Sequence, residues 1–170
     1  MNELGREQLA RLLKDAHIKS RIVKELRFVP EEIKNWGDLD MLAVPTRGGN
    51  EGVLMVQASR FYVLPYELNT KIKDKSTGRS KRIICDFCCT WQQGGKSGRI
   101  TFIRKSNGHS FTYLCCGDLR CSLHVRDKTP EAALSRAQLH EDINTERRIT
   151  RLKDGLSTIM NTVGAEPVPN

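Results

Sequence analysis

The chain has 170 residues, of which 38% are hydrophobic and 28% are charged, a balance typical of one globular domain with a substantial core. It has no apolar run of roughly 18 residues, so the composition excludes a membrane-spanning helix. Residues 1–7 are polar and lack the apolar stretch of a signal peptide. We therefore expect a cytoplasmic protein whose thiols stay reduced.

The net charge of +8 is concentrated in one segment. Residues 71–128 hold 13 Lys and Arg against 4 Asp and Glu, whereas the rest of the chain holds 15 against 16. A positive field of this kind attracts nucleic acid, ribosomes or an acidic protein surface. The alternative is a solvated surface without a partner, but the concentration of charge favours a binding face.

The N-terminal part of the chain is predicted to be helical. Apolar residues at helical spacing indicate helices over residues 3–16 and 18–26. Pro30 is typical of the first turn of a short helix that cannot continue past Gly37. Residues 45–50 are rich in Pro and Gly, so we expect a loop there.

Strands are predicted from residue 52 onward. Residues 52–57 are apolar and β-branched, and residues 60–64 form a second candidate strand that ends at Pro65. Residues 71–82 have a turn at their centre and few apolar groups, so we expect an exposed hairpin tip or a mobile loop. Further strands are predicted at residues 82–84, 99–104 and 111–114, with a turn at 106–109.

Helices are predicted again in the C-terminal part. Asp118 favours the start of a helix that continues through Val125, and Thr129-Pro130-Glu131 begins another short helix. Residues 140–163 have the pattern of a long amphipathic helix. Its outer side is predicted to carry Arg147, Arg148, Arg151 and Lys153.

We expect a single α+β domain over residues 1–163, followed by a disordered tail at 164–170. The domain is expected to comprise an N-terminal helical part (1–45), a sheet with a zinc finger (46–128) and C-terminal helices (129–163).

The six cysteines predict a structural zinc site. Cys85 and Cys88 form a C-x-x-C pair, Cys116 and Cys121 form a second pair, and a Gly-rich turn and a predicted hairpin separate the two pairs. Structural Zn²⁺ takes four thiolate or imidazole ligands in a tetrahedron. The order of knuckle, hairpin and ligands at a helix start is that of a treble-clef finger. We expect an antiparallel sheet with this four-cysteine finger.

The cysteines and His124 also allow other roles. Cys115 in place of Cys116 is an alternative third ligand, and His124 an alternative ligand further along the chain. Otherwise Cys115 and Cys89 are expected to be small core side chains. A redox dithiol is disfavoured because a hairpin, not a helix, follows Cys88. Catalysis is disfavoured because a closed four-cysteine site has no open position for a substrate, and no small-molecule substrate is expected.

Several blocks of the sequence resemble the FusB-type family of elongation-factor-G-binding treble-clef proteins. They are residues 112–126 around the second cysteine pair, residues 84–88 around the first, residues 36–42 and residues 146–152. The resemblance covers most of the chain and implies a zinc-dependent α+β domain that binds elongation factor G, a translational GTPase. Cys115 stands where the family pattern has an apolar residue.

The resemblance also implies a role at the ribosome. The fusidic-acid-resistance members free elongation factor G from drug-stalled ribosomes through this zinc domain, and they are longer, with an additional N-terminal helical bundle. Housekeeping relatives have a length similar to that of this chain. An RNA- or ribosome-binding zinc module without affinity for the factor is the alternative hypothesis.

The candidate contact residues for the partner are aromatic and basic groups near the metal, because such side chains provide most of the binding energy in interfaces. A core position for Phe111 and a helix-capping role for Arg126 are the alternatives. The candidates are Phe87, Trp91, Lys105, Phe111, Arg120 and Arg126.

Overall fold

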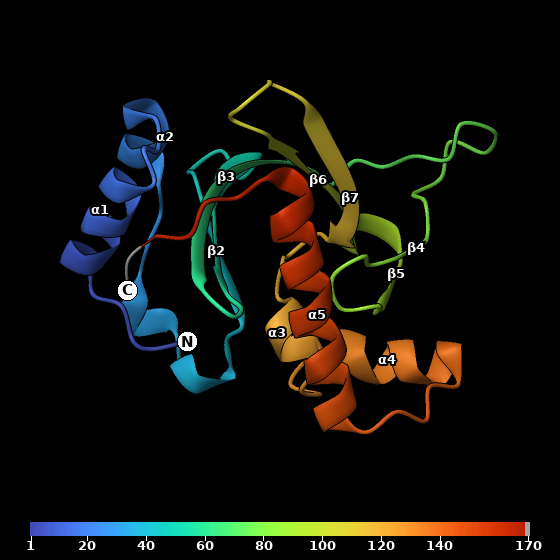
Figure 1. The fold of residues 1–170 in the computed structure, drawn as a ribbon. Helices are drawn as coiled ribbons and strands as arrows, with labels where there is room; N and C mark the ends of the chain where they lie inside the picture. The colour runs from blue at the N-terminus through green and yellow to red at the C-terminus, as the bar shows by residue number, and fades with distance from the viewer. Residues whose placement is uncertain (169–170) are drawn as a thin grey trace.

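The structure is a computed structural model that describes residues 1–168. Its centre is a five-stranded antiparallel sheet in the order β1-β2-β3-β6-β7, with a separate β4-β5 ribbon beside it (Figure 1). This confirms the predicted α+β class with an antiparallel sheet. The strands are β1 (Met41–Pro45), β2 (Glu51–Gln57), β3 (Phe61–Asn69), β4 (Ile83–Ile84), β5 (Trp91–Gln92), β6 (Ser97–Ile103) and β7 (Ser110–Cys116).

Helices flank the sheet on both sides. The two predicted N-terminal helices and the long C-terminal helix are present, and each is shorter than the residue range predicted for it. The helices are α1 (Arg6–Asp15), α2 (Ser20–Glu25), α3 (Cys121–His124), α4 (Pro130–Leu139) and α5 (Thr145–Val163), and the 3-10 turns are η1 (Pro30–Glu32), η2 (Trp36–Asp38) and η3 (Gly94–Lys96).

Helix α5 covers one face of the sheet (Figure 1). Its apolar side chains recur every three or four residues, so they form one stripe along the helix. Leu152, Leu156 and Met160 of this stripe are fully buried and share a core with Leu54 of β2 and Phe102 of β6. The cysteine cluster belongs to the same core, so the cluster is packed beneath α5 and the sheet.

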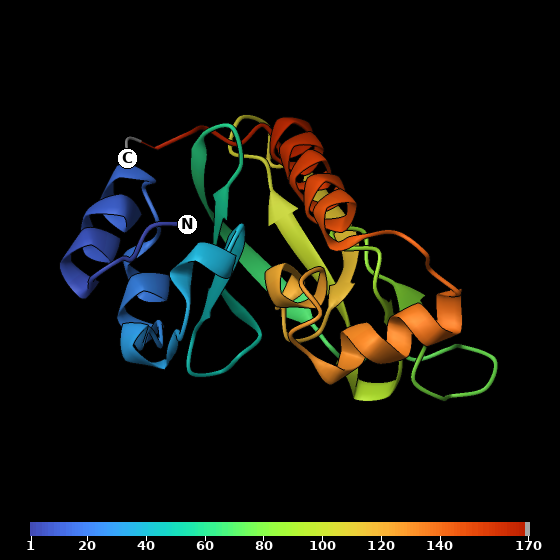
Figure 2. The same cartoon turned by 90° about the horizontal axis from the view of Figure 1, so that it is seen from below.

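Helices α1 and α2 cover the opposite face of β1, β2 and β3 (Figures 1 and 2). Leu9 of α1 and Ile22 of α2 form a second core with Val53 and Met55 of β2. Because both faces of β2 are covered, residues 52–56 are all buried and lack the alternation of a strand with one solvated face.

Strand β3 continues through Pro65, so the predicted end of this strand is wrong. Pro65 faces Val53 of β2, whereas β6 pairs with β3 only at residues 67–69. The Phe61 carbonyl, on the side away from β2, accepts a hydrogen bond from Val168 N. Alternate residues point their backbone groups to the same side, so the missing N–H of Pro65 also lies away from β2. The β2–β3 ladder therefore loses no hydrogen bond there.

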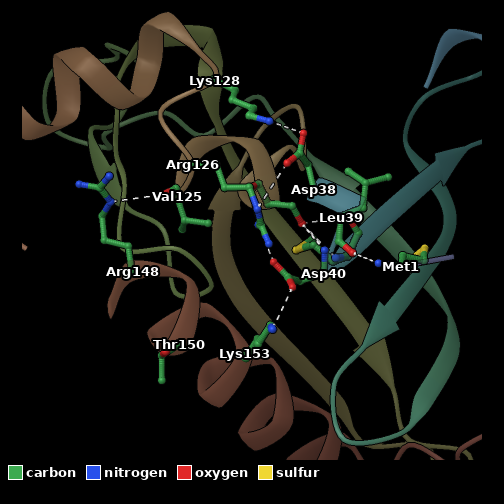
Figure 3. Close-up of polar contacts among 12 residues, drawn as sticks. Met1, Asp38, Leu39, Asp40, Val125, Arg126, Lys128, Arg148, Thr150 and Lys153 are labelled. Carbon is green, nitrogen blue, oxygen red and sulfur yellow. Dashed lines mark hydrogen bonds and ion pairs between the residues drawn. The ribbon is translucent and has the colours of Figure 1, made fainter. Parts of the chain in front are cut away.

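Charged side chains join the start of β1 to the segment after α3 (Figure 3). Arg126 Nη1 donates to Asp40 Oδ2 at 2.6 Å, and Arg126 Nε lies 3.9 Å from Asp38 Oδ1. Lys128 pairs with Asp38, and Lys153 Nζ of α5 lies 3.7 Å from Asp40 Oδ1. We call these five residues the Asp40 network; it connects three segments that are distant in the sequence.

Arg148 is buried, although the sequence pattern placed it on the outer side of the long helix. Only 5% of the residue is exposed. Its guanidinium donates to the carbonyl oxygens of Val125 and Ile143 and to Asp127 Oδ2, at 3.2, 2.9 and 2.5 Å. Arg148 thus fastens the first turn of α5 to the end of α3, and its charge is compensated inside the protein.

Two boundaries differ from the expected division of the chain. Strand β1 lies at residues 41–45 and belongs to the sheet, although residues 1–45 were expected to be a helical part. Within the expected disordered tail, Pro167 forms a bridge with Tyr62 of β3, and Val168 is buried and donates to Phe61 O. Residues 169–170 lie outside the described residues. Nowhere in residues 1–168 does a helix combine the length and apolar character needed to cross a membrane.

Candidate metal centre

The first cysteine pair lies in a tight turn after β4. Cys89 N donates to Cys85 O at 2.9 Å, and Cys85 N donates to Thr90 O at 3.0 Å. Cys89 has a φ of 57°, in the left-handed region that closes such a turn. This backbone path brings the Sγ atoms of Cys85 and Cys88 to the same side of the turn, where both are buried.

The second pair spans the end of β7 and the start of α3. Cys116 is the last residue of β7, and Cys121 is the first residue of α3. In the turn between them, Leu119 has a φ of 53° and Asp118 Oδ1 accepts a hydrogen bond from Arg120 N. The helix predicted to start at Asp118 is therefore a turn followed by a four-residue helix. Cys116 lies at the end of strand β7.

The four sulfur atoms fit a tetrahedral zinc site. The Sγ atoms of Cys85, Cys88, Cys116 and Cys121 all lie within 4.8 Å of one another. The distance from Cys85 to Cys121 is 3.7 Å and that from Cys88 to Cys116 is 3.5 Å. A tetrahedron with Zn–S bonds of about 2.3 Å has edges of about 3.8 Å. All four side chains are buried, so the donor set suits a closed structural site.

The two remaining cysteines lie outside this cluster. Cys115 pairs with Gly98 across β6 and β7, and a side chain on Gly98 would approach Cys115 Sγ to 3.0 Å. Burial raises the pKa of Cys115 well above its ordinary value, so the residue stays a thiol in the core. Burial also raises the pKa of Cys89, which is half-buried. Both positions agree with a packing role.

Polar side chains around the cluster point at its sulfur atoms. His124 Nδ1 lies 3.2 Å from Cys116 Sγ, and Gln92 Nε2 donates to the same sulfur at 3.3 Å. Thr90 Oγ1 lies 3.0 Å from Cys88 Sγ and donates when that sulfur is a thiolate. Four thiolates around Zn²⁺ carry net negative charge, and these buried donors offset the cost of burying it.

His124 lies beside the cluster of four cysteine sulfur atoms and is not a member of it. Its Nε2 atom lies 3.5 Å from Asp118 Oδ2, so the carboxylate orients the ring toward Cys116. Burial alone would lower the pKa of His124, but Asp118 and the Cys88 thiolate outweigh it and raise the pKa to about 9. Burial would likewise raise the pKa of Asp118, yet His124 holds it below its ordinary value.

Removing the His124 donor is expected to weaken zinc retention. In the variant His124→Leu, Cys116 Sγ loses one of its two side-chain donors, and we expect about 10–100-fold weaker zinc binding. The variant His124→Asn keeps an N–H donor near the position of Nδ1, so we expect partial recovery. Competition with a chromophoric chelator measures both. Unchanged zinc affinity in a folded His124→Leu protein would contradict this role.

Comparison with known families agrees with this geometry. The family model described as the FBP C-terminal treble-clef zinc-finger matches residues 20–163. The chain belongs to this family. Comparisons with curated proteins and with solved structures gave no match. Membership in the FBP zinc-finger family confirms the expected resemblance, the treble-clef fold and the structural zinc as cofactor.

Two of the residues expected at the partner surface of this FBP zinc finger are engaged inside the protein. Phe87 is only 1% exposed and packs edge-on against Tyr113, with ring centroids 6.2 Å apart. The knuckle turns Phe87 inward, so its expected exposure is wrong. Arg126 belongs to the Asp40 network, and its side chain is 12% exposed. Its guanidinium pairs with the Asp40 and Asp38 carboxylates, and its Nη1 atom also donates to the carbonyl oxygen of Ser122 in α3 at 2.9 Å, as the helix-capping alternative expects.

The other four expected residues reach the surface. Trp91 on β5 and Phe111 on β7 are half-buried, and Arg120 is exposed before α3. Phe111 lies under the Arg104 guanidinium, with the carbon of that group 4.6 Å from the ring centroid. Lys105 is exposed and its Nζ donates to Ala16 O at 2.8 Å. The four residues lie on four different segments, which are β5, the turn between β6 and β7, β7, and the turn before α3.

Proposed function

We propose that this protein is a non-catalytic adaptor that binds elongation factor G at or near the ribosome and aids release of the factor. Membership in the FBP zinc-finger family supports this proposal, because the resemblance of the sequence to FusB-type proteins implies binding of that factor. In the proposal, one structural zinc held by Cys85, Cys88, Cys116 and Cys121 stabilises the binding module.

The metal centre supports a structural role. A catalytic zinc keeps one position open for water or substrate, whereas four cysteine ligands fill a tetrahedral site. The four cysteines are at most 1% exposed, so a substrate has no direct path to the metal. We therefore propose that the zinc shapes the binding surface and takes no part in a reaction.

An exposed apolar patch beside the knuckle supports a protein partner. Ile84 of β4 and Trp91 of β5 are opposite residues in an antiparallel pair, so their side chains share one face of the ribbon. Leu134 of α4 lines the same surface hollow as Trp91, and Ile84 and Leu134 are 50% and 43% exposed. We call these three residues the Trp91 patch. Aromatic anchors flanked by apolar side chains are typical of interface centres.

Binding of purified elongation factor G is expected to depend on the Trp91 patch. The variant Leu134→Glu places a charge in an interface that must lose its water, and we expect at least about 30-fold weaker binding, as for other interface centres. Isothermal titration calorimetry with the zinc-loaded protein measures this loss. Trp91→Ala is the second variant, with zinc content and circular dichroism as checks of folding.

The variant Ile103→Glu is a matched control. Ile103 is 56% exposed and lies on β6, outside the Trp91 patch, so the same charge should leave the affinity within a factor of about two. The proposed function fails if the wild-type protein does not bind elongation factor G while ribosomes still retain it. That result would favour the RNA- or ribosome-binding alternative.

A further inference from the structure

Residues 71–82 form a basic arm that projects from the body of the protein between β3 and β4 (Figures 1 and 2). The arm is a small hairpin, with a bridge between Lys73 and Ser80 and a hydrogen bond from Asp74 N to Arg79 O at 2.8 Å. Its base is held to β6, because Ser97 Oγ donates to Lys81 O at 2.9 Å. The arm therefore has a defined shape and a fixed base.

The arm carries most of the positive charge that remains unneutralised in its segment. It contains six Lys and Arg and one Asp. In the described part of the chain, none of these six takes part in an ion pair. In contrast, Lys96 pairs with Glu131, and Arg126 and Lys128 pair with the carboxylates of the Asp40 network. Folding therefore concentrates the available cations on the arm.

The only carboxylate of the arm is engaged in its turn. Asp74 Oδ1 accepts hydrogen bonds from the backbone N–H groups of Ser76 and Thr77, at 3.0 and 2.9 Å, and from both hydroxyl groups. Asp74 thus closes the turn and does not pair with any of the neighbouring cations. The Lys and Arg side chains on both sides of the turn are left for an external anion.

The composition of the arm favours phosphate groups over a protein surface. Ile72 is its only aliphatic residue and is half-buried, so the arm offers no apolar centre of the kind found in protein interfaces. It contains no aromatic residue that could stack on an unpaired base. Six exposed cations on a narrow hairpin suit contacts to a sugar–phosphate backbone, which depend on charge and not on base sequence.

We propose that the basic arm binds the phosphate backbone of structured RNA. The choice of RNA among polyanions rests on the proposed function, because elongation factor G works on the ribosome. The arm shares no residue with the Trp91 patch, which lies on β4, β5 and α4. One molecule can then hold the factor through the patch and RNA through the arm.

Charge reversal in the arm tests the proposal. The variant Lys73→Glu/Lys75→Glu/Arg79→Glu is compared with the wild-type protein by fluorescence anisotropy on a labelled RNA hairpin over a range of KCl concentrations. Each lost phosphate contact reduces the slope of log Kobs against log salt by roughly 0.7–0.9. We expect the slope to fall by about 2–3 and the affinity at about 0.1 M salt to fall at least about 30-fold.

The control reverses the same number and kinds of charge elsewhere. The variant Arg11→Glu/Lys14→Glu/Lys24→Glu changes exposed residues of α1 and α2, and its RNA affinity should stay within about threefold of wild type. Equal losses in both variants would overturn the proposal, since they would report net charge alone. An unchanged affinity in the arm variant would also overturn it, as would stronger binding to anionic lipid vesicles than to RNA.

Binding of elongation factor G by the arm variant separates this proposal from the proposed function. We expect the arm variant to bind the isolated factor as the wild-type protein does. If it loses the factor but keeps RNA, the arm belongs to the protein interface and the RNA proposal is wrong. If neither the wild-type protein nor the arm variant binds the factor, but RNA binding depends on the arm, the proposed function fails and the arm proposal stands.

Discussion

The variant Cys116→Ala is expected to lose its zinc and to unfold at the zinc-containing end, whereas Cys115→Ala is expected to keep both metal and fold. Binding of structural zinc contributes about 10–16 kcal/mol in zinc-finger peptides, which is comparable with the whole stability of a domain, about 5–15 kcal/mol. The cluster shares the core of α5 and the sheet, so its loss should spread to both. Zinc content by mass spectrometry and thermal unfolding by circular dichroism measure the difference.

The adjacent cysteine makes this comparison specific. Cys115 and Cys116 have the same chemistry and are both buried, but only Cys116 Sγ lies in the four-sulfur cluster. Cys115→Ala removes one buried sulfur atom beside Gly98, and we expect a cost of about 1–2 kcal/mol from the small cavity. Loss of zinc from Cys115→Ala with retention by Cys116→Ala would show that the ligand assignment is wrong.

The variant Arg126→Met is expected to destabilise the protein by about 3 kcal/mol. Methionine retains much of the apolar stem, but Asp40, which is 5% exposed, loses its 2.6 Å partner and keeps its charge. Removing one member of a buried pair costs about 3–5 kcal/mol. We expect the lower end of that range, because Lys153 Nζ still lies 3.7 Å from Asp40. Urea denaturation of the zinc-loaded protein measures the change.

Two further variants establish the cause of that loss. Arg120→Met alters an exposed arginine nearby, and we expect a change within about 0.5 kcal/mol. The double variant Asp40→Leu/Arg126→Met removes both charges, so it should recover a large part of the stability lost in Arg126→Met. Equal destabilisation by the single and double variants would mean that the packing of Arg126, and not its pairing with Asp40, stabilises the fold.

Local patterns in the sequence predicted most elements and the composition of the metal cluster. The spacing of Cys85, Cys88, Cys116 and Cys121 selected the four residues that the fold brings together, because a knuckle and a strand–turn–helix each impose a short spacing on their ligands. The amphipathic pattern predicted α5, since its apolar stripe must face a core. That residues 1–163 form a single domain, and which partner binds its surface, stay predictions.

The errors arose where a contact across the chain decided the outcome. The strand end at Pro65 is wrong because β6 begins to pair with β3 only beyond that residue. Arg148 looked solvent-exposed in a helical pattern, but Val125 O and Asp127 Oδ2, more than 20 residues away, accept hydrogen bonds from its guanidinium. Phe87 has the local sequence of an exposed knuckle residue, and only its place in the core between α5 and the sheet shows that it is packed inside.

The sequence by itself determined the zinc chemistry, the fold class and the segment that carries the excess positive charge, because these follow from residue type and short spacing. Only the tertiary structure decided which of those charges are available to a partner. Arg126 pairs with Asp40, 86 residues away, so its charge is neutralised inside the protein. Asp74, the one carboxylate of the basic arm, is engaged in its turn, and none of the six cations of the arm forms an ion pair among the described residues.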